Sequence, residues 1–447
     1  MDKHMISSRV DDAMPAILDE LKEFVAIESI SASSFDQNTL KESAAWIASR
    51  VEKLGLDTEV IQIETEDGLV GRPAILASRP AEPGKPTVLL YAHHDVQPVG
   101  ELSEWDSEPF VAVERDGRLY GRGTADDKAG VLVHLAAIEA AEPGVGIRLF
   151  IEGEEEVGSP TFVAFLEKYR ERLEADVIVV ADSSNWKVGV PALTTSLRGV
   201  VQLEVSIKVL DHALHSGFFG GPVLDAVVVA SRLISTLHDD AGNVAVAGLL
   251  QEDSTQVDYP EDDFRRDAGV LDGVQLAGSG SFTSRLWTKP AISVIGMDVT
   301  PVAISSNTII PSVDLAISMR VAPGQDSREA AELLAQHLRD HVPFGAQIEV
   351  TIAEAGSAFS AGEDTEATEM ARWALKEAWG VDPVDIGQGG SIPFIADLAK
   401  AFPQAQILVT GIEDPDTRAH SANESLHIED FRNAIVAQAL LMSRLAE

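Results

Sequence analysis

The chain has 447 residues, 45% of them hydrophobic, and a formal net charge of −38 at pH 7. This length is too great for one ordinary core and this composition excludes a disordered chain, so two globular domains are expected. The strongly negative charge argues against nucleic acid and anionic membranes as partners. Cysteine is absent, which excludes disulfide bonds and leaves His, Asp and Glu as metal ligands.

The sequence contains no sign of membrane insertion or secretion. No apolar run reaches the length of a membrane span, and the first thirty residues carry acidic side chains and no signal-peptide core. Together with the absence of cysteine, these features predict a cytoplasmic protein. The acidic residues are spread along the whole chain, which indicates general solubility or salt adaptation more than one acidic site.

Helical spacing of apolar residues opens the chain, and three short apolar runs follow, each ending in polar residues. The runs cover residues 87–92, 147–151 and 177–181. Because they are apolar on both faces, they predict central strands of a sheet with helices on both sides. Residues 129–141 predict a helix between two of these strands. Such an α/β fold places its site residues just beyond the carboxyl ends of the strands.

The middle of the chain has a different pattern. The expected elements are a strand at 200–209, a helix at 222–238, strands at 291–296 and 312–321, a helix at 327–339 and a strand at 346–353. This βαββαβ order is that of the ferredoxin-like fold. We therefore predict a catalytic α/β domain of residues 1–196 and 356–447, with an inserted ferredoxin-like domain of residues 197–355.

His93 and Asp95 follow the first apolar run. Two residues apart on an extended chain, they lie on the same face. A histidine with a carboxylate is a common pair for a divalent metal, in which the carboxylate can orient the imidazole. An ordinary surface loop is the alternative. His94, between them, is expected to point to the opposite side.

Two acidic stretches follow, and each has a structural and a functional interpretation. Asp126 and Asp127 precede the predicted helix, where they either cap it or supply a carboxylate that bridges two cations. The run Glu154–Glu156 follows a strand, so it forms either a solvated face or a carboxylate cluster that needs a metal. In such a cluster one glutamate is a ligand, and its neighbour acts as a general base.

Asp182 and His420 complete the inventory. Asp182 ends the third apolar run and forms either an Asx turn or a further ligand. His420 lies in a polar loop near the C-terminus, where a lone histidine is more often structural. Together, these histidines and carboxylates suit a hydrolase that holds two cations about 3.5–4 Å apart with a bridging carboxylate and a base.

In their order along the chain, these motifs resemble those of the M20 metallopeptidase family, which includes carnosinase-type dipeptidases and aminoacylases. The matching stretches are His93–Pro98, Gly121–Lys128, Glu155–Ser159 and Ala419–Glu424. The resemblance implies that His93 and Asp182 hold one metal ion, Glu156 and His420 hold the other, Asp126 bridges them, Glu155 is the general base and Asp95 orients His93. It also implies a cis peptide bond after Asp126, and it leaves Glu154 outside the catalytic pair.

The inserted segment resembles the lid and dimerisation domain of the family. His215 matches a lid histidine that reaches the active site of a partner subunit and stabilises the oxyanion there. Thr308, Arg320 and Ser391 match positions that bind the substrate's carboxylate, a task that suits arginine because of its bidentate pairing. A homodimer is therefore expected.

The resemblance implies a dinuclear-metal dipeptidase that cleaves dipeptides with a free C-terminal carboxylate, through a metal-bound hydroxide and a glutamate general base. Two divalent ions per subunit are expected, zinc first, with manganese and cobalt as alternatives. Two other functions stay open: an N-acyl amino acid deacylase or desuccinylase of the same family, and a catalytically silent acidic metal-binding protein. The sequence does not determine the side-chain preference.

Overall fold

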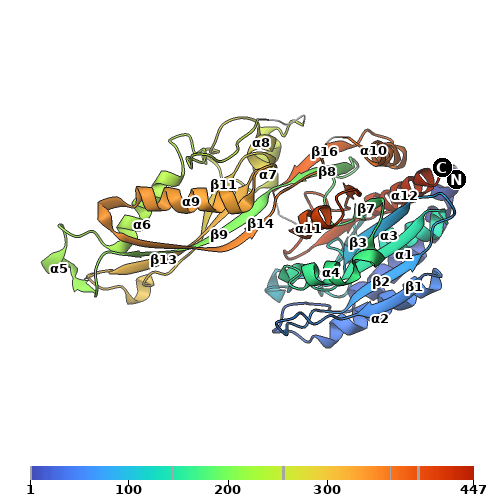
Figure 1. Ribbon diagram of the computed structural model, residues 1–447, viewed down its shortest axis with the longest axis horizontal. Coiled ribbons are helices and arrows are strands. Elements are labelled where there is room, and N and C mark those ends of the chain that lie inside the picture. Colours follow the sequence, from blue (N-terminus) through green and yellow to red (C-terminus); the bar gives the residue numbers. More distant parts are fainter. Residues whose placement is uncertain (1–2, 143, 254–256, 363, 390–392) are drawn as a thin grey trace. The chain divides into compact units, whose positions relative to one another are not determined.

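The computed structural model describes residues 3–142, 144–253, 257–362, 364–389 and 393–447. The chain forms two compact units (Figure 1). Unit 1 comprises Met1–Thr195, Ala361–Ile386 and Asp397–Glu447, and unit 2 comprises Ser196–Ser360 and Gly387–Ala396. The boundaries expected from the sequence placed Gly387–Ala396 in the first domain. This segment is tied to the start of unit 2, because the Arg198 N–H donates to the Gln388 carbonyl at 3.2 Å.

The large sheet of unit 1 has parallel strands at its centre. Its strands are β1 (Asp57–Ile61), β2 (Ala74–Arg79), β3 (Thr87–His93), β6 (Gly146–Glu152), β7 (Val177–Val180), β8 (Ala192–Leu197) and β17 (Gln406–Val409). They run in the order β1-β2-β6-β3-β7-β17-β8, and β15 (Phe359–Ser360) and β16 (Val384–Gln388) also pair with β8. β6, β3, β7 and β17 are mutually parallel, so their carboxyl ends meet at one edge of the sheet.

Helices cover both faces of this sheet, as the sequence predicts. They are α1 (Lys3–Val25), α2 (Asn38–Lys53), α3 (Lys128–Ala141), α4 (Phe162–Leu173), α10 (Glu366–Trp379), α11 (Pro393–Ala401) and α12 (Ile428–Leu445). Leu149 of β6 belongs to the core that α3 and α12 share, whereas Phe150 stacks on Phe165 of α4 at 4.6 Å. Successive strand residues therefore contact helices on opposite faces.

Helix α3 lies at the centre of unit 1. All of its residues except Glu139 are buried, and it contacts both α1 and α12. A helix that is apolar around its whole circumference is stable only inside a core. This buried helix begins two residues after Asp126, so it provides a rigid support for that side chain.

Unit 2 has the ferredoxin-like fold that the sequence predicts. Its main elements are β9 (Gly199–Lys208), α6 (Ala226–Ile234), β11 (Ala291–Met297), β13 (Ser312–Val321), α9 (Ser327–His341) and β14 (Gln347–Gly356). The strands form an antiparallel sheet in the order β11-β13-β9-β14, and α6 and α9 pack on it. Helix α6 is shorter than predicted, because the Asp225 side chain caps it by accepting from the Val228 N–H at 3.0 Å.

The remaining elements are short. In unit 1 they are η1 (Leu102–Glu104), β4 (Val113–Arg115), β5 (Arg118–Tyr120), η2 (Glu155–Val157) and β18 (Ser425–His427), and in unit 2 they are β10 (Leu214–His215), α5 (Ser216–Phe219), η3 (Ser235–Leu237), α7 (Glu261–Asp267), α8 (Phe282–Trp287), η4 (Val302–Ile304), β12 (Thr308–Ile309) and η5 (Pro343–Gly345). Among the described residues, no helix combines the length and the apolar character that a bilayer crossing requires.

Candidate metal centre

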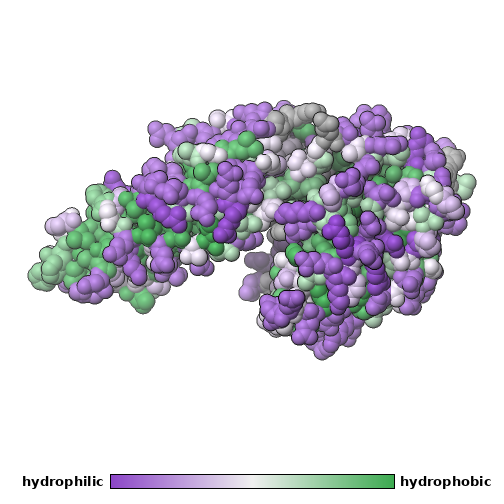
Figure 2. Space-filling model, in the orientation of Figure 1, coloured by the Kyte–Doolittle hydropathy of each residue, from purple (hydrophilic) through white to green (hydrophobic). Residues whose placement is uncertain are grey.

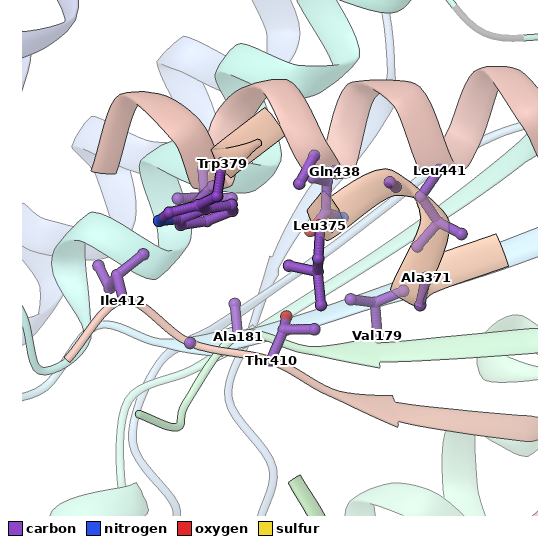
Figure 3. Close-up of a pocket in the computed structure, with 14 residues that line it drawn as sticks. Val179, Ala181, Ala371, Leu375, Trp379, Thr410, Ile412, Gln438 and Leu441 are labelled. Carbon is purple, nitrogen blue, oxygen red and sulfur yellow. The ribbon is translucent and has the colours of Figure 1, made fainter. Parts of the chain in front are cut away.

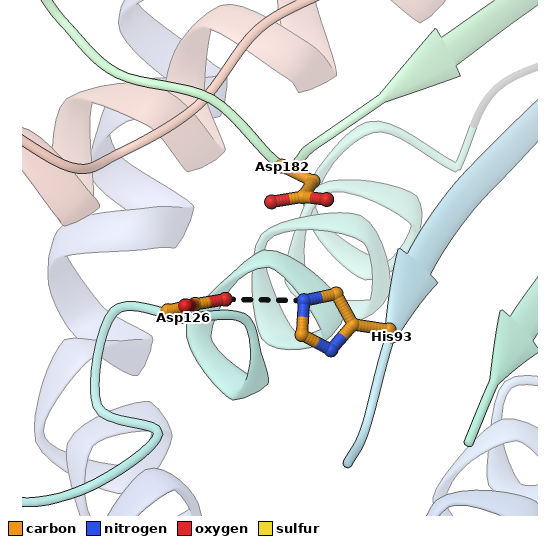
Figure 4. A group of neighbouring side chains, drawn as sticks. All are labelled: His93, Asp126 and Asp182. Carbon is orange, nitrogen blue, oxygen red and sulfur yellow. Dashed lines mark hydrogen bonds and ion pairs between the residues drawn. The ribbon is translucent and has the colours of Figure 1, made fainter. Parts of the chain in front are cut away.

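Two groups of possible metal ligands lie beyond the carboxyl ends of the parallel strands. The donor atoms of His93, Asp126 and Asp182 all lie within 4.8 Å of one another, and so do those of Asp126, Glu156 and His420. Figure 4 shows His93 at the end of its strand, with Asp126 and Asp182 turned toward it. The structure thus brings together all five residues that the resemblance assigned to metal binding.

Asp126 belongs to both groups. Its Oδ1 lies 3.1 Å from Nε2 of His93, and its Oδ2 lies 2.9 Å from Nε2 of His420. The same His420 nitrogen is 3.1 Å from Oε2 of Glu156. The peptide bond between Asp126 and Asp127 is cis, as expected. One carboxylate therefore presents an oxygen to each of two histidines, which is the arrangement that a bridging ligand needs.

The electrostatics of the centre favour positive charge. Hydrogen bonds that His420 donates to the carboxylates of Asp126 and Glu156 raise the pKa of His420 to about 11. Burial raises the pKa of Glu156 to about 7, and the charge of Asp126 adds to the rise. Burial likewise raises the pKa of Asp182 to about 6. Buried carboxylates in such proximity are costly unless cations balance them, so this set of oxygen and nitrogen donors fits a pair of divalent cations.

Asp95 connects the two sides of the centre. Nδ1 of His93 lies 3.1 Å from the Asp95 carbonyl oxygen and 3.4 Å from its Oδ1. Because a carbonyl only accepts, Nδ1 carries the proton, and Nε2 is left free to bind a cation. The Asp95 carboxylate also accepts from the backbone N–H groups of Glu155 at 3.2 Å and Glu156 at 3.0 Å. It thus fixes both the His93 ring and the turn that carries the two glutamates.

Glu155 differs from its neighbour Glu156. Among the described residues it belongs to neither ligand group. Burial raises its pKa well above the usual value, and the carboxylates of Asp182 and Glu156 add to the rise. A glutamate with a raised pKa beside a metal site can take up and release a proton near neutral pH.

His94 and Glu154, the two rival candidates, face away from the centre. His94 donates from Nε2 to the Pro73 carbonyl at 2.9 Å, and its Nδ1 accepts from the Ser43 hydroxyl at 2.9 Å. Burial lowers the pKa of His94 to about 4, so the ring is neutral. The Glu154 carboxylate accepts from the backbone N–H groups of Arg72 and Thr161, each at 2.9 Å. Both side chains therefore have structural contacts.

Glu424 has a role that the sequence analysis did not assign. Its buried carboxylate accepts from the backbone N–H groups of Gly123 at 3.1 Å, Ala125 at 3.1 Å and Asp126 at 3.2 Å. It also accepts from Nη1 of Arg122 at 2.6 Å. Glu424 therefore fixes the loop that presents Asp126. Its position in the same motif as His420 was the only signal in the sequence.

Gln97 and Asp127 also hold ligand residues in place. Nε2 of Gln97 donates to Oε2 of Glu156 at 2.8 Å and to its carbonyl oxygen at 3.1 Å. Oδ2 of Asp127 accepts from the backbone N–H of His93 at 3.1 Å. Both belong to the quoted motifs, but nothing in the sequence identified these contacts.

The site residues expected in unit 2 are described separately. His215 and Thr308 pair directly across β10 and β12, and both are exposed. Nδ1 of His215 accepts from the Gly217 N–H at 3.0 Å. Arg320 lies on β13, partly buried. Ser391 lies outside the described residues.

A cavity of about 30 Å³ in unit 1 is lined by none of the candidate metal ligands (Figure 3). It is lined by apolar side chains such as Leu375, Trp379 and Leu441, together with the polar Thr410 and Gln438. None of the lining residues is acidic, basic or a histidine. This cavity therefore suits packing between helices and sheet, and it offers no hydrolytic group.

Comparison with known proteins agrees with this geometry. The family model described as Peptidase family M20/M25/M40 matches residues 89–444. The chain is 33% identical over 433 residues to the cysteinylglycine-S-conjugate dipeptidase of Corynebacterium striatum, which covers 95% of this chain and 94% of that protein. It is 27% identical over 434 residues to the human Beta-Ala-His dipeptidase, covering 91% and 85% of the two chains.

Solved structures give the same result. The crystal structure of human carnosine dipeptidase 1 has a TM-score of 0.83 and 25% sequence identity, over 99% of this chain and 98% of that chain. The family that the motifs resemble is confirmed. The chain belongs to peptidase family M20/M25/M40 and is a hydrolase that acts on peptide bonds.

Proposed function

We propose that the protein is a dinuclear-metal dipeptidase, which cleaves dipeptides with a free C-terminal carboxylate. The observation that carries this proposal is the pair of ligand groups that share Asp126, with a partly buried Glu155 that is subject to the charges of His93 and Asp182. The dipeptide as substrate is supported by two relatives, which are named cysteinylglycine-S-conjugate dipeptidase and Beta-Ala-His dipeptidase.

In this proposal, His93 and Asp182 would hold one cation, Glu156 and His420 would hold the other, and Asp126, which belongs to both groups, would contribute to each. Two divalent cations in such a site polarise the scissile carbonyl and lower the pKa of water. Imidazole and carboxylate donors suit zinc, which we propose first, with manganese and cobalt as alternatives.

The protein's own groups then move the proton. Glu155 takes the proton of the attacking water and passes it to the leaving amine, and its raised pKa suits both transfers. Asp95 keeps the backbone of Glu155 in place. Thr308, Arg320 and Ser391 bind the substrate's carboxylate, and His215 of the partner subunit stabilises the developing oxyanion.

A homodimer is part of this proposal, and the surface around His215 supports it. Phe218 is 81% exposed and Phe219 is 53% exposed in α5, which directly follows His215. Figure 2 shows hydrophobic surface over this end of unit 2. Contiguous exposed apolar side chains are typical of protein–protein contacts.

A substrate comparison tests the proposal. The purified protein, supplied with Zn²⁺, Mn²⁺ or Co²⁺, is assayed on free dipeptides and on N-acetyl and N-succinyl amino acids. We expect hydrolysis of the free dipeptides with the higher kcat/KM. Preference for the acylated amino acids would instead identify a deacylase or desuccinylase. No hydrolysis of either class with any of the three metals would favour the silent metal-binding protein.

A further inference from the structure

Arg198 is a buried cation of unit 2 that none of the site motifs includes. It lies between β8 and β9 and is only 8% exposed. Its Nη1 donates weakly to the carbonyl oxygens of Arg285 at 3.4 Å and Lys289 at 3.3 Å. Its Nε has no hydrogen-bond partner within the described parts of the chain. A buried guanidinium is costly without an anion, and backbone carbonyls balance only part of its charge.

Arg320 lies close to Arg198. The register of β9 and β13 pairs Val200 with Arg320 and Gly199 with Val321. Arg198 directly precedes β9, at the end of that strand where Arg320 is paired, so the two arginines lie near each other on neighbouring segments. Burial lowers the pKa of Arg198 to about 10, and the charge of Arg320 adds to the fall. The two guanidinium groups thus lie close enough to repel each other.

Gly389 lies next to the Arg198 guanidinium. A Cβ atom on Gly389 would lie 2.6 Å from Nη2 of Arg198, so a larger residue there would displace the guanidinium from its present position. The carbonyl oxygen of Gln388, the residue before Gly389, accepts a hydrogen bond from the backbone N–H of Arg198 at 3.2 Å. The Gly-Gly-Ser-Ile-Pro stretch, whose resemblance pointed to carboxylate binding, therefore begins against the Arg198 side chain.

We propose that Arg198 and Arg320 form one anion site, and that its ligand is the free carboxylate of the substrate. This inference rests on the proposed function and deepens it, because it adds a second guanidinium to the one that the motifs indicate. A carboxylate has two oxygens that accept from guanidinium N–H groups, and its charge offsets the repulsion between the two arginines. The site then selects substrates with a free carboxyl end over the corresponding amides.

The test compares Arg198→Met with Arg198→Lys, since methionine removes the charge and lysine keeps it. KM and kcat are measured for a dipeptide and for its C-terminal amide. We expect Arg198→Met to raise the KM of the dipeptide about 10- to 100-fold, the effect of losing one charged hydrogen bond. Lysine should restore part of this loss, and the KM of the amide should change little in either variant. Equal KM values for wild type and Arg198→Met, or equal losses in the methionine and lysine variants, would overturn the inference.

Direct binding separates this inference from the proposed function. Calorimetric titration with free glycine, and with glycine amide as the control, reports on the carboxylate site without turnover. We expect glycine binding to weaken in both Arg198→Met and Arg320→Met, and the double variant to lose less than the sum of the two, because neighbouring residues of one site are not additive. Additive losses of glycine affinity, or unchanged glycine binding in a variant with the melting temperature of the wild type, would contradict the inference. A wild type that cleaves no dipeptide contradicts the proposed function alone.

Discussion

The acidic residues of the metal centre differ in what their carboxylates contact. Asp126 faces two imidazoles, whereas the Glu424 carboxylate accepts hydrogen bonds from backbone N–H groups and one guanidinium. Glu155 belongs to neither ligand group of the described residues. These contacts distinguish the three carboxylates in a way that residue type alone does not.

The adjacent Glu155 and Glu156 give a matched pair of variants. We expect Glu155→Gln to keep its metal content and to lose about 10²- to 10⁴-fold in kcat, because it removes the proposed proton acceptor. Glu156→Gln should instead lose metal, because it removes a ligand. Turnover is followed by steady-state kinetics and metal by elemental analysis. A Glu155→Gln enzyme that works near the wild-type rate would remove Glu155 from its assigned role.

Glu424 is predicted to matter for stability. Glu424→Ala leaves the Arg122 guanidinium buried without its carboxylate, which typically costs about 3–5 kcal/mol in the free energy of unfolding. Urea unfolding of the variant and the wild type measures the difference. Glu424→Gln is the control, since it keeps an acceptor for the N–H groups and should lose less. A loss below about 1 kcal/mol in the alanine variant would contradict this role.

At the scale of secondary structure, the buried helix α3 makes unit 1 sensitive to acid. Its His134 donates from Nε2 to the Tyr91 carbonyl at 2.8 Å, and burial lowers the His134 pKa to about 4. In the unfolded chain a histidine has a pKa of about 6.5. Between these two values the unfolded chain binds a proton that the folded chain does not. The free energy of unfolding therefore falls as the pH drops from 6.5 toward 4.

His134→Gln tests this sensitivity. Between pH 7 and pH 5, the wild type should lose about 2 kcal/mol more stability than the variant, because only the wild type carries this histidine. Urea unfolding at the two pH values measures the difference, and the other histidines cancel in the comparison. Equal losses in the two proteins would show that His134 is not a source of the acid sensitivity.

The elements differ in how well the sequence predicts them. The apolar runs became β3, β6 and β7, and the helix expected at residues 129–141 became α3, because elements that are buried on all sides leave a clear apolar pattern in the sequence. The segment Gly387–Ala396 has no such pattern, so only tertiary contacts assign it to unit 2. The start of α6 depends on the Asp225 cap, which a periodic pattern does not include.

The candidate site shows the same division. Motif order predicted the five proposed ligands and the proposed base, because such chemistry needs a fixed set of residue types. The supporting contacts of Glu424, Gln97 and Arg198 could not be predicted, since each joins segments that are distant in the sequence. The metal, the cytoplasmic location and the homodimer stay predictions.

At the scale of the whole molecule, the proposed dimer is open to a simple test. Phe218→Glu places a charge in the exposed apolar surface of α5 and should yield a monomer by light scattering. Turnover should fall while metal content stays the same, because His215 would no longer reach a partner. Phe344→Glu is the matched control, since Phe344 is 72% exposed in η5 of the same unit. A fully active Phe218→Glu monomer would contradict the role proposed for His215.

The insertion of unit 2 into unit 1 has a consequence for synthesis. Helix α3 packs against α12, yet the whole of Ser196–Ser360 lies between them in the sequence. On the ribosome, the apolar surface of α3 emerges long before α12, which packs against it. By the time α12 is synthesised, all of unit 2 has already been synthesised. Because domains generally fold as units during translation, we expect unit 2 to fold before unit 1 is complete. The incomplete unit 1 then exposes the apolar surface of α3 until α12 has been synthesised.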